Sequence, residues 1–209
     1  MKSQISLAFQ KCRQEERPAL ITYTVAGDNT KKRSLEILKS ISKYADILEI
    51  GFPHNAPTAD GPQIQNSSYR ALKNGIKLKD VFQIVKKFKK MNPQKPLILM
   101  GYFNLIYQSG ENNFLKNCKK VGVDGLIIVD LQPEEDSELF TKSRQRDIDL
   151  IRLITPTTDD KRLITILSNA SGFLYYVTVT GITGQNSANI EDLKKSINTI
   201  KLSTKLPIV

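Results

Sequence analysis

Apolar and polar residues alternate along the chain in two kinds of segment. Short runs rich in β-branched residues are followed by longer stretches in which apolar residues recur every three or four positions. This alternation is typical of βα units, whose parallel strands are buried on both faces and therefore read as continuous apolar runs. It predicts strands over residues 19–25, 46–50, 96–100, 125–129, 149–153 and 173–177, with a seventh beginning at 206–209.

Helices are predicted between these strands and before the first one. An N-terminal helix spans about residues 3–14, and the long segment between the second and third strands has room for helices over 61–72 and 78–91. Gly122 stops another helix, just before a turn into the fourth strand. The repeating pattern has no linker or break in composition, so we expect one domain over residues 1–209.

Two architectures accommodate these units: an open doubly wound sheet and a closed (β/α)8 barrel. The spacing of the strands does not choose between them. No G-x-G-x-x-G motif follows the first strand, which removes the best sequence signal of a dinucleotide-binding open sheet.

Composition and charge argue against two classes of function, nucleic-acid binding and membrane insertion. The 209 residues carry a net charge of +10, and the densest basic cluster, residues 86–90, falls on a predicted helix and is accompanied by no nucleic-acid motif. We therefore do not expect nucleic-acid binding, although a positive field would attract a phosphorylated metabolite. No apolar stretch approaches the roughly 20 residues of a membrane span, and no signal-peptide core is present, which predicts a cytoplasmic protein.

We do not expect a metal site, because the residue types that usually bind metals are few and scattered. The two cysteines, Cys12 and Cys118, are far apart in the sequence, and His54 is the only histidine. Neither a zinc site nor a disulfide framework is indicated by this pattern.

Glu49 is the first candidate for chemistry, because it lies inside an apolar strand near its C-terminal end. In a βα barrel, active sites form at these strand ends. Apolar surroundings would raise the pKa of the carboxyl group and suit it to general acid or base catalysis near neutral pH. A purely structural glutamate, bonded to a neighbouring strand, is the alternative.

Asp60 follows Glu49 across a loop that contains Pro53, Pro57 and, just beyond, Pro62. Two carboxylates around one strand end favour acid–base chemistry, which often needs two groups in different environments. Alternatively, Asp60 is a residue that simply starts the next helix. His54 in the same loop would titrate near neutral pH, although a surface histidine is the simpler interpretation.

A second loop, residues 180–187, follows the sixth strand and contains two glycines. Glycine permits close approach of the backbone, and such loops present N–H groups to phosphate, although this composition is also ordinary for a loop.

Together these segments resemble the tryptophan synthase alpha family, and the resemblance covers nearly the whole chain in the family's order. The matching motifs are Leu48-Glu49-Ile50-Gly51, Ala59-Asp60-Gly61-Pro62, Ile64-Gln65, Met100, Tyr102, Asn104, Val121-Gly122-Val123-Asp124, Val129-Asp130, Tyr175 and Gly181-Ile182-Thr183-Gly184. The resemblance implies an α/β fold of the (β/α)8 TIM-barrel type, of which this sequence supplies about seven strands.

The resemblance also implies a reaction: retro-aldol cleavage of indole-3-glycerol phosphate to indole and glyceraldehyde 3-phosphate. Glu49 matches the family's acid–base residue, and Asp60 matches the carboxylate that holds the indole N–H. The other positions that match substrate-binding residues are Tyr23, Ile64, Met100, Tyr102, Ile127, Tyr175, Thr183 and Gly184.

By the same resemblance the chain needs no cofactor of its own. The family's partner is a beta subunit, which binds pyridoxal phosphate, receives the indole and forms an alpha2-beta2 tetramer. Asn104 and residues 52–57 match the docking face. Here Ala56 stands where the family usually has an acid, and Gln132 replaces a frequent proline, so we expect altered coupling to the partner.

The family continues beyond the position of Val209 with strand eight and two phosphate-binding turns. Our hypothesis from the sequence is therefore a fragment of a longer gene product, with those elements missing, and the alternative is a natural short form that another chain completes. One rival function is a phosphosugar isomerase or synthase, but no lysine or cysteine marks strands one, two, four or six. The other is a non-catalytic module that docks on the beta subunit, which would not need both Glu49 and Asp60.

Overall fold

The computed structural model describes residues 3–178 and 190–209. Its central feature is a parallel sheet of six strands that pair in chain order, with each strand hydrogen-bonded to the next. The strands are β1 (Ile21–Val25), β2 (Ile47–Gly51), β3 (Leu97–Gly101), β4 (Gly125–Ile128), β5 (Asp149–Ile154) and β6 (Leu174–Tyr176). All six strands predicted from the apolar runs are confirmed, with ends that differ by two residues or fewer.

Helices occupy the connections, as the βα pattern predicts. They are α1 (Gln4–Gln14), α2 (Lys31–Ile41), α3 (Pro62–Lys73), α4 (Leu78–Met91), α5 (Phe103–Ser109), α6 (Glu111–Val121), η1 (Pro133–Glu135), α7 (Ser137–Arg144), α8 (Asp160–Ser168) and α9 (Ile190–Ser203). Side-chain oxygens of Ser3, Thr30 and Asp159 cap α1, α2 and α8. Capping satisfies backbone N–H groups that a first helical turn leaves unpaired.

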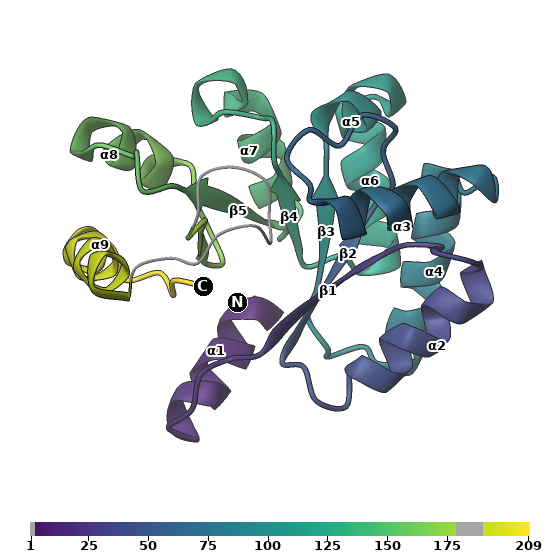
Figure 1. The fold of residues 1–209 in the computed structure, drawn as a ribbon, viewed down its shortest axis with the longest axis horizontal. Coiled ribbons are helices and arrows are strands. Elements are labelled where there is room, and N and C mark those ends of the chain that lie inside the picture. The colour runs from purple at the N-terminus through teal and green to yellow at the C-terminus, as the bar shows by residue number, and fades with distance from the viewer. Residues whose placement is uncertain (1–2, 179–189) are drawn as a thin grey trace.

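The sheet curls, and the helices α2 to α8 follow its outside (Figure 1). Alternate strand residues point outward, such as Leu48, Leu99 and Leu126, and pack with helix residues into the main core. The opposite face, which we call the inner face, carries a second apolar cluster: Ile47, Ile98, Ile127, Ile151 and Phe173, joined by Ile5 of α1. The structure is therefore an incomplete barrel, as the resemblance implied.

Helix α1 packs against the N-terminal ends of the strands. Phe9 meets Phe173 edge-on, with ring centroids 5.5 Å apart. A Cβ atom on Gly125, the first residue of β4, would lie 2.7 Å from Ile151 Cδ1 and 2.8 Å from Ile5 Cδ1, so any larger residue would force these two buried side chains to shift. Because α1 covers this end of the sheet, the C-terminal ends of the strands are left for chemistry.

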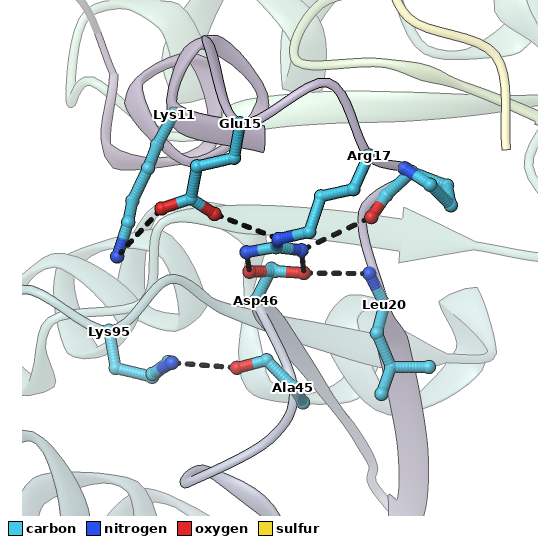
Figure 2. A network of polar contacts seen from close by, with 8 residues as sticks. Lys11, Glu15, Arg17, Leu20, Ala45, Asp46 and Lys95 are labelled. Atoms are coloured by element: carbon cyan, nitrogen blue, oxygen red, sulfur yellow. Dashed lines mark hydrogen bonds and ion pairs between the residues drawn. The ribbon is translucent and has the colours of Figure 1, made fainter. Parts of the chain in front are cut away.

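A polar network reinforces the same N-terminal end (Figure 2). The Arg17 guanidinium donates two hydrogen bonds to the Asp46 carboxylate, at 2.7 and 2.8 Å, and a third to Glu15. Asp46 also accepts from the Leu20 backbone N–H at 2.8 Å. These contacts hold the pKa of Asp46 well below its usual range and join the segments that enter β1 and β2.

The last four residues extend the sheet beside β6. Ile208 forms a parallel bridge with Leu174, and the Tyr176 N–H donates to the Val209 carbonyl at 2.7 Å. The predicted seventh strand is thus present as one bridge. The single-domain organisation of residues 1–209 stays a prediction. Within the described ranges, none of the helices has the length and apolar character needed to cross a membrane.

Candidate functional site

The register of the sheet brings the predicted site residues onto one face. Tyr23 pairs with Glu49, and Met100 pairs with Ile127. Paired residues in parallel strands point to the same side, and so do residues two apart. Tyr175, opposite Leu153, belongs to this set as well. All five therefore lie on the inner face.

Glu49 is almost completely buried, with 3% of its surface exposed. Its Oε1 atom has no hydrogen-bond partner among the described residues. Desolvation of the charged form raises the pKa of the carboxyl group to about 7. A structural glutamate would be expected to bond to a neighbouring strand, so the free oxygen argues against that alternative.

Asp60 ends the loop that leaves β2, directly before Gly61 and the start of α3. Its side chain is half-buried, and its Oδ2 accepts a hydrogen bond from the Tyr102 hydroxyl at 3.3 Å. Burial raises the pKa of Asp60, while the Tyr102 hydroxyl and the nearby His54 lower it. The second carboxylate therefore sits in a more polar environment than Glu49, as the two-carboxylate hypothesis expects.

Tyr102, just past the end of β3, ties the loops at this edge together. Its hydroxyl also accepts the Ala59 N–H at 3.0 Å, and its ring stacks on His54. The next residue, Phe103, donates its N–H to Asp130 Oδ1 at 2.7 Å, which joins the loops after β3 and β4. Burial, followed by the charge of Asp60, raises the pKa of Tyr102 to about 12, so it remains a neutral hydrogen-bonding group.

Tyr23 connects the two carboxylates electrostatically. Burial raises its pKa, and the charges of Asp60 and then Glu49 add to the effect. Burial also raises the pKa of Tyr175, and the charge of Glu49 adds to the effect. The phenols and carboxylates therefore share one environment.

Gly51 is a site residue that the sequence reasoning matched only as part of a motif. A Cβ atom at this position would lie 2.0 Å from the Tyr23 hydroxyl. Only glycine lets Tyr23 lie across the end of β2. The signal available in the sequence was a glycine that directly follows a buried strand carrying a carboxylate.

The remaining predicted residues are placed less uniformly. Ile64 on α3 is half-buried and packs against the main core, whereas Ile127 is fully buried in the inner-face cluster. Met100 is half-buried beside that cluster. Thr183 and Gly184, with the rest of the loop at 180–187, lie outside the described residues. Contact of these side chains with a substrate stays a prediction.

The residues that match the family's docking face are only partly at the surface. Asn55, Ala56 and Asn104 are exposed, whereas Phe52 and Pro53 are buried because the loop starts at the end of β2. Gln132 is exposed and accepts a hydrogen bond from Arg162. Arg162 also pairs with Glu134 at 2.7 Å. The loop after β4 is thereby fastened to α8.

The arrangement suits proton transfer. One carboxyl group can hold or release a proton near neutral pH, and a second carboxylate beside a phenol can bind an N–H group or stabilise positive charge. Among the residues that the structure describes, no group of three or more His, Cys, Asp and Glu side chains is arranged to hold a metal ion.

Comparisons with known proteins identify the family of the chain. The sequence model of the tryptophan synthase alpha chain family matches residues 9–209. A tryptophan synthase alpha chain from Pelagibacter ubique (strain HTCC1062) is 62% identical over 182 residues, which are 87% of this chain and 69% of the relative.

Solved structures extend the comparison to the fold. Tryptophan synthase subunit alpha from Legionella pneumophila superposes with a TM-score of 0.91 at 33% identity, over 100% of this chain and 77% of that one. A chain of the tryptophan synthase a2b2 complex from Pyrococcus furiosus gives 0.84 at 38% identity, over 91% and 76%. The chain belongs to the tryptophan synthase alpha chain family and is a lyase of tryptophan biosynthesis.

Proposed function

We propose that this chain cleaves indole-3-glycerol phosphate into indole and glyceraldehyde 3-phosphate, with Glu49 as acid and base and Asp60 as the indole-binding carboxylate. The observation that carries the proposal is the state of Glu49. It is a buried carboxyl group with an unpartnered oxygen and a pKa of about 7, on the inner face at the C-terminal end of β2.

The first step is protonation of the indole ring. Protonated Glu49 gives its proton to C3 of the indole, which breaks the aromaticity of the five-membered ring and leaves positive charge on it. Asp60 accepts a hydrogen bond from the ring N–H and stabilises that charge. Tyr102 keeps the Asp60 carboxylate in place through its 3.3 Å contact.

The second step breaks the carbon–carbon bond. The Glu49 carboxylate removes the proton from the hydroxyl group on the carbon attached to C3. The C3–carbon bond then cleaves, its electron pair returns to the ring to restore indole, and the former alcohol carbon becomes the aldehyde of glyceraldehyde 3-phosphate. Glu49 ends protonated, ready for another turnover, so protons and electrons balance without a cofactor in this chain.

The other predicted residues surround the substrate in this proposal. Tyr23, Met100, Tyr175 and Ile127 on the inner face, with Tyr102 and Ile64 at the rim, contact the indole ring. Thr183 and Gly184 hold the phosphate. The apolar parts of these surrounding side chains strengthen the electrostatic effects of Glu49 and Asp60, because charges interact more strongly away from water.

We further propose a tryptophan synthase beta subunit as the partner, in an alpha2-beta2 assembly in which pyridoxal phosphate belongs to the beta subunit. The Pyrococcus furiosus relative was solved as an a2b2 complex. Asn104 and the exposed part of residues 52–57 form the docking face, and residues 52–57 belong to the same loop as Asp60. The absence of an acidic group at Ala56 predicts that a charged contact with the partner is replaced by apolar contact.

The test is a product assay with purified chain, alone and with a beta subunit, in which indole and glyceraldehyde 3-phosphate are both quantified. We expect the two products in equal amounts. In Asp60→Asn, which keeps the shape but removes the charge, kcat should fall about 10²-fold. If no indole forms although the chain still stimulates the beta subunit, the non-catalytic docking module is the correct function instead.

A further inference from the structure

Arg152 is a charged residue inside the apolar layer outside β5, and the proposed reaction does not use it. It is 4% exposed, on the face of the strand opposite to Ile151 and Leu153, which belong to the inner face. The residues two positions away on the same face, Leu150 and Ile154, are buried and apolar. Burying a guanidinium among such residues costs free energy unless its donors find acceptors, so its contacts carry information.

The Arg152 guanidinium binds three acceptors from two connecting segments. Its Nη2 donates to Oδ2 of Asp136, which directly precedes α7 and is 2% exposed. Its Nε donates to the Asn169 carbonyl at 2.9 Å, at the end of α8, and its Nη1 donates to the Leu131 carbonyl at 3.5 Å. The side-chain amide of Asn169 donates in turn to the Pro133 carbonyl at 3.3 Å. The planar guanidinium therefore ties residues 129–136, which we call the β4–α7 connection, to β5.

The β4–α7 connection reaches the candidate site through Asp130. Asp130 directly precedes Leu131 and accepts the N–H of Phe103, the first residue of α5, at 2.7 Å. The preceding residue, Tyr102, donates its hydroxyl to Asp60 Oδ2 at 3.3 Å. Asp130 is itself exposed, so burial does not hold it in place. Its position depends on how firmly the rest of the connection is held.

The energetics of a buried ion pair favour a positioning role over a stabilising one. Removing two charges from water costs about as much as their attraction returns, and a well-packed apolar pair in the same place is often equally stable. The Oδ1 atom of Asp136 has no hydrogen-bond partner among the described residues, which adds to the cost. What the Arg152–Asp136 pair supplies is direction, because the guanidinium has a fixed donor geometry.

We propose that Arg152 is a positioning residue, which fixes the β4–α7 connection and, through Asp130, the start of α5 and Tyr102. Arg152 lies on the outer side of the sheet, so it acts through this connection and not on the substrate. The positioning of α5 stands on the contacts alone, whereas its consequence for turnover rests on the proposed function.

The first test replaces both charges of the pair, in Arg152→Met with Asp136→Leu. No buried charge is left unpaired, so the double variant should unfold in urea at the wild-type midpoint or above it. The Phe103 N–H should nevertheless exchange with deuterium at least about ten-fold faster, because Asp130 is no longer held as its acceptor. Amide exchange measured by NMR reports this, with the amides of β3 as internal reference. A purely structural role predicts unchanged exchange in a folded double variant, which would overturn the proposal.

Arg152→Lys decides the question if the double variant does not fold. Lysine leaves a cation beside Asp136, but a single ammonium cannot also reach the Leu131 and Asn169 carbonyls. We expect a folded chain in which the Phe103 N–H again exchanges faster than in the wild type. Wild-type exchange in Arg152→Lys would overturn the proposal, because the charge alone would then be sufficient.

A second buried ion pair provides the matched control. Lys89 Nζ lies 2.9 Å from Asp124 Oδ2, at the N-terminal end of β4 and away from the candidate site. Lys89→Met with Asp124→Asn removes this pair and should leave the exchange of the Phe103 N–H unchanged. An increase as large as that caused by the Arg152 variants would mean that the loss of any buried pair loosens α5, which contradicts a specific role for Arg152.

The kinetic test is kcat and KM for indole release in the same proteins. We expect kcat to fall about ten-fold in the Arg152→Met, Asp136→Leu chain and to stay unchanged in the control. Adding Asp130→Ala to the double variant should cause no further loss, because both changes act through one contact. An independent, multiplicative loss would contradict this path. If the wild-type chain releases no indole, the proposed function fails, while the exchange of the Phe103 N–H still decides the positioning of α5.

Discussion

Glu49 is the residue at which stability and function conflict. A carboxyl group that is 3% exposed, with an oxygen that lacks a partner in the described structure, is costly to ionise. The same desolvation raises the pKa of the carboxyl group to about 7, so below that pH the group stays protonated and the fold avoids the cost of a buried charge. Replacing it should therefore improve stability while it removes the acid–base group.

Glu49→Gln should change the pH dependence of stability in a defined direction. Because the pKa is raised from 4.5 in the folded chain, the wild type loses stability as pH rises from 4.5 through about 7. The loss amounts to about 3 kcal/mol above pH 7. Glutamine removes it, so the variant should be more stable than wild type at pH 8.

Urea denaturation at pH 4.5 and pH 8 measures this effect. The advantage of Glu49→Gln at pH 8 should be nearly absent at pH 4.5. If the variant is less stable than wild type at pH 8, the glutamate carboxylate has a stabilising partner and our description of its environment is wrong.

Tyr102→Phe should weaken the hold on Asp60. The variant removes the hydroxyl that Asp60 and Ala59 share, so kcat for indole release should fall about ten-fold and stability by about 1 kcal/mol. Tyr107→Phe is the matched control, because Tyr107 lies on the next helix and is 72% exposed. Equal effects in both variants would exclude a special role for Tyr102.

The sequence alone singled out Glu49, because a carboxylate at the end of an apolar strand is unusual, and Asp60, because it lies across one loop from Glu49. It could not reveal the stacking of His54 on Tyr102 or the closeness of Gly51 to Tyr23. Those contacts depend on the path of a loop and on strand register, which local patterns do not specify.

At the scale of elements, strands were easier to predict than short helices. Continuous apolar runs identify buried parallel strands. Helix α5 and η1 are too short for an apolar period to emerge, and α5 begins where Asp130 accepts the Phe103 N–H. Its start is fixed by a contact from another loop, which the sequence of the helix does not contain.

The end of β2 should be intolerant of any side chain. In Gly51→Ala, the new Cβ would meet the Tyr23 hydroxyl at 2.0 Å, which forces Tyr23 away from the site. We expect a loss of about 1–3 kcal/mol in stability and a lower kcat. Urea denaturation should show partial recovery in Gly51→Ala with Tyr23→Phe, since the closest atom is then gone. No recovery would mean that the strain lies in the backbone.

At the scale of the whole molecule, strand spacing alone left an open sheet and a barrel equally possible. The motif resemblance favoured the barrel, and the consecutive β1–β6 order confirms it, because a doubly wound sheet reverses its strand order. Helix α1 packs on the inner-face cluster through Ile5.

We predict that residues 1–209 unfold as one domain. Cys12 lies in α1 and Cys118 in α6, and both thiols are buried. If the domain is single, thiol labelling at increasing urea should expose both cysteines at the same midpoint, together with the loss of helical signal. Earlier exposure of Cys12 would show that α1 and its barrel end unfold separately.

The central claim is that buried Glu49 carries the proton in a carbon–carbon lyase. The most direct measurement is kcat for indole release at pH 7 by the wild-type chain and by Glu49→Gln, with folding of both verified by circular dichroism. We predict a loss of at least about 10²-fold in the variant, which retains its fold. A folded Glu49→Gln chain that releases indole at the wild-type rate would contradict the account.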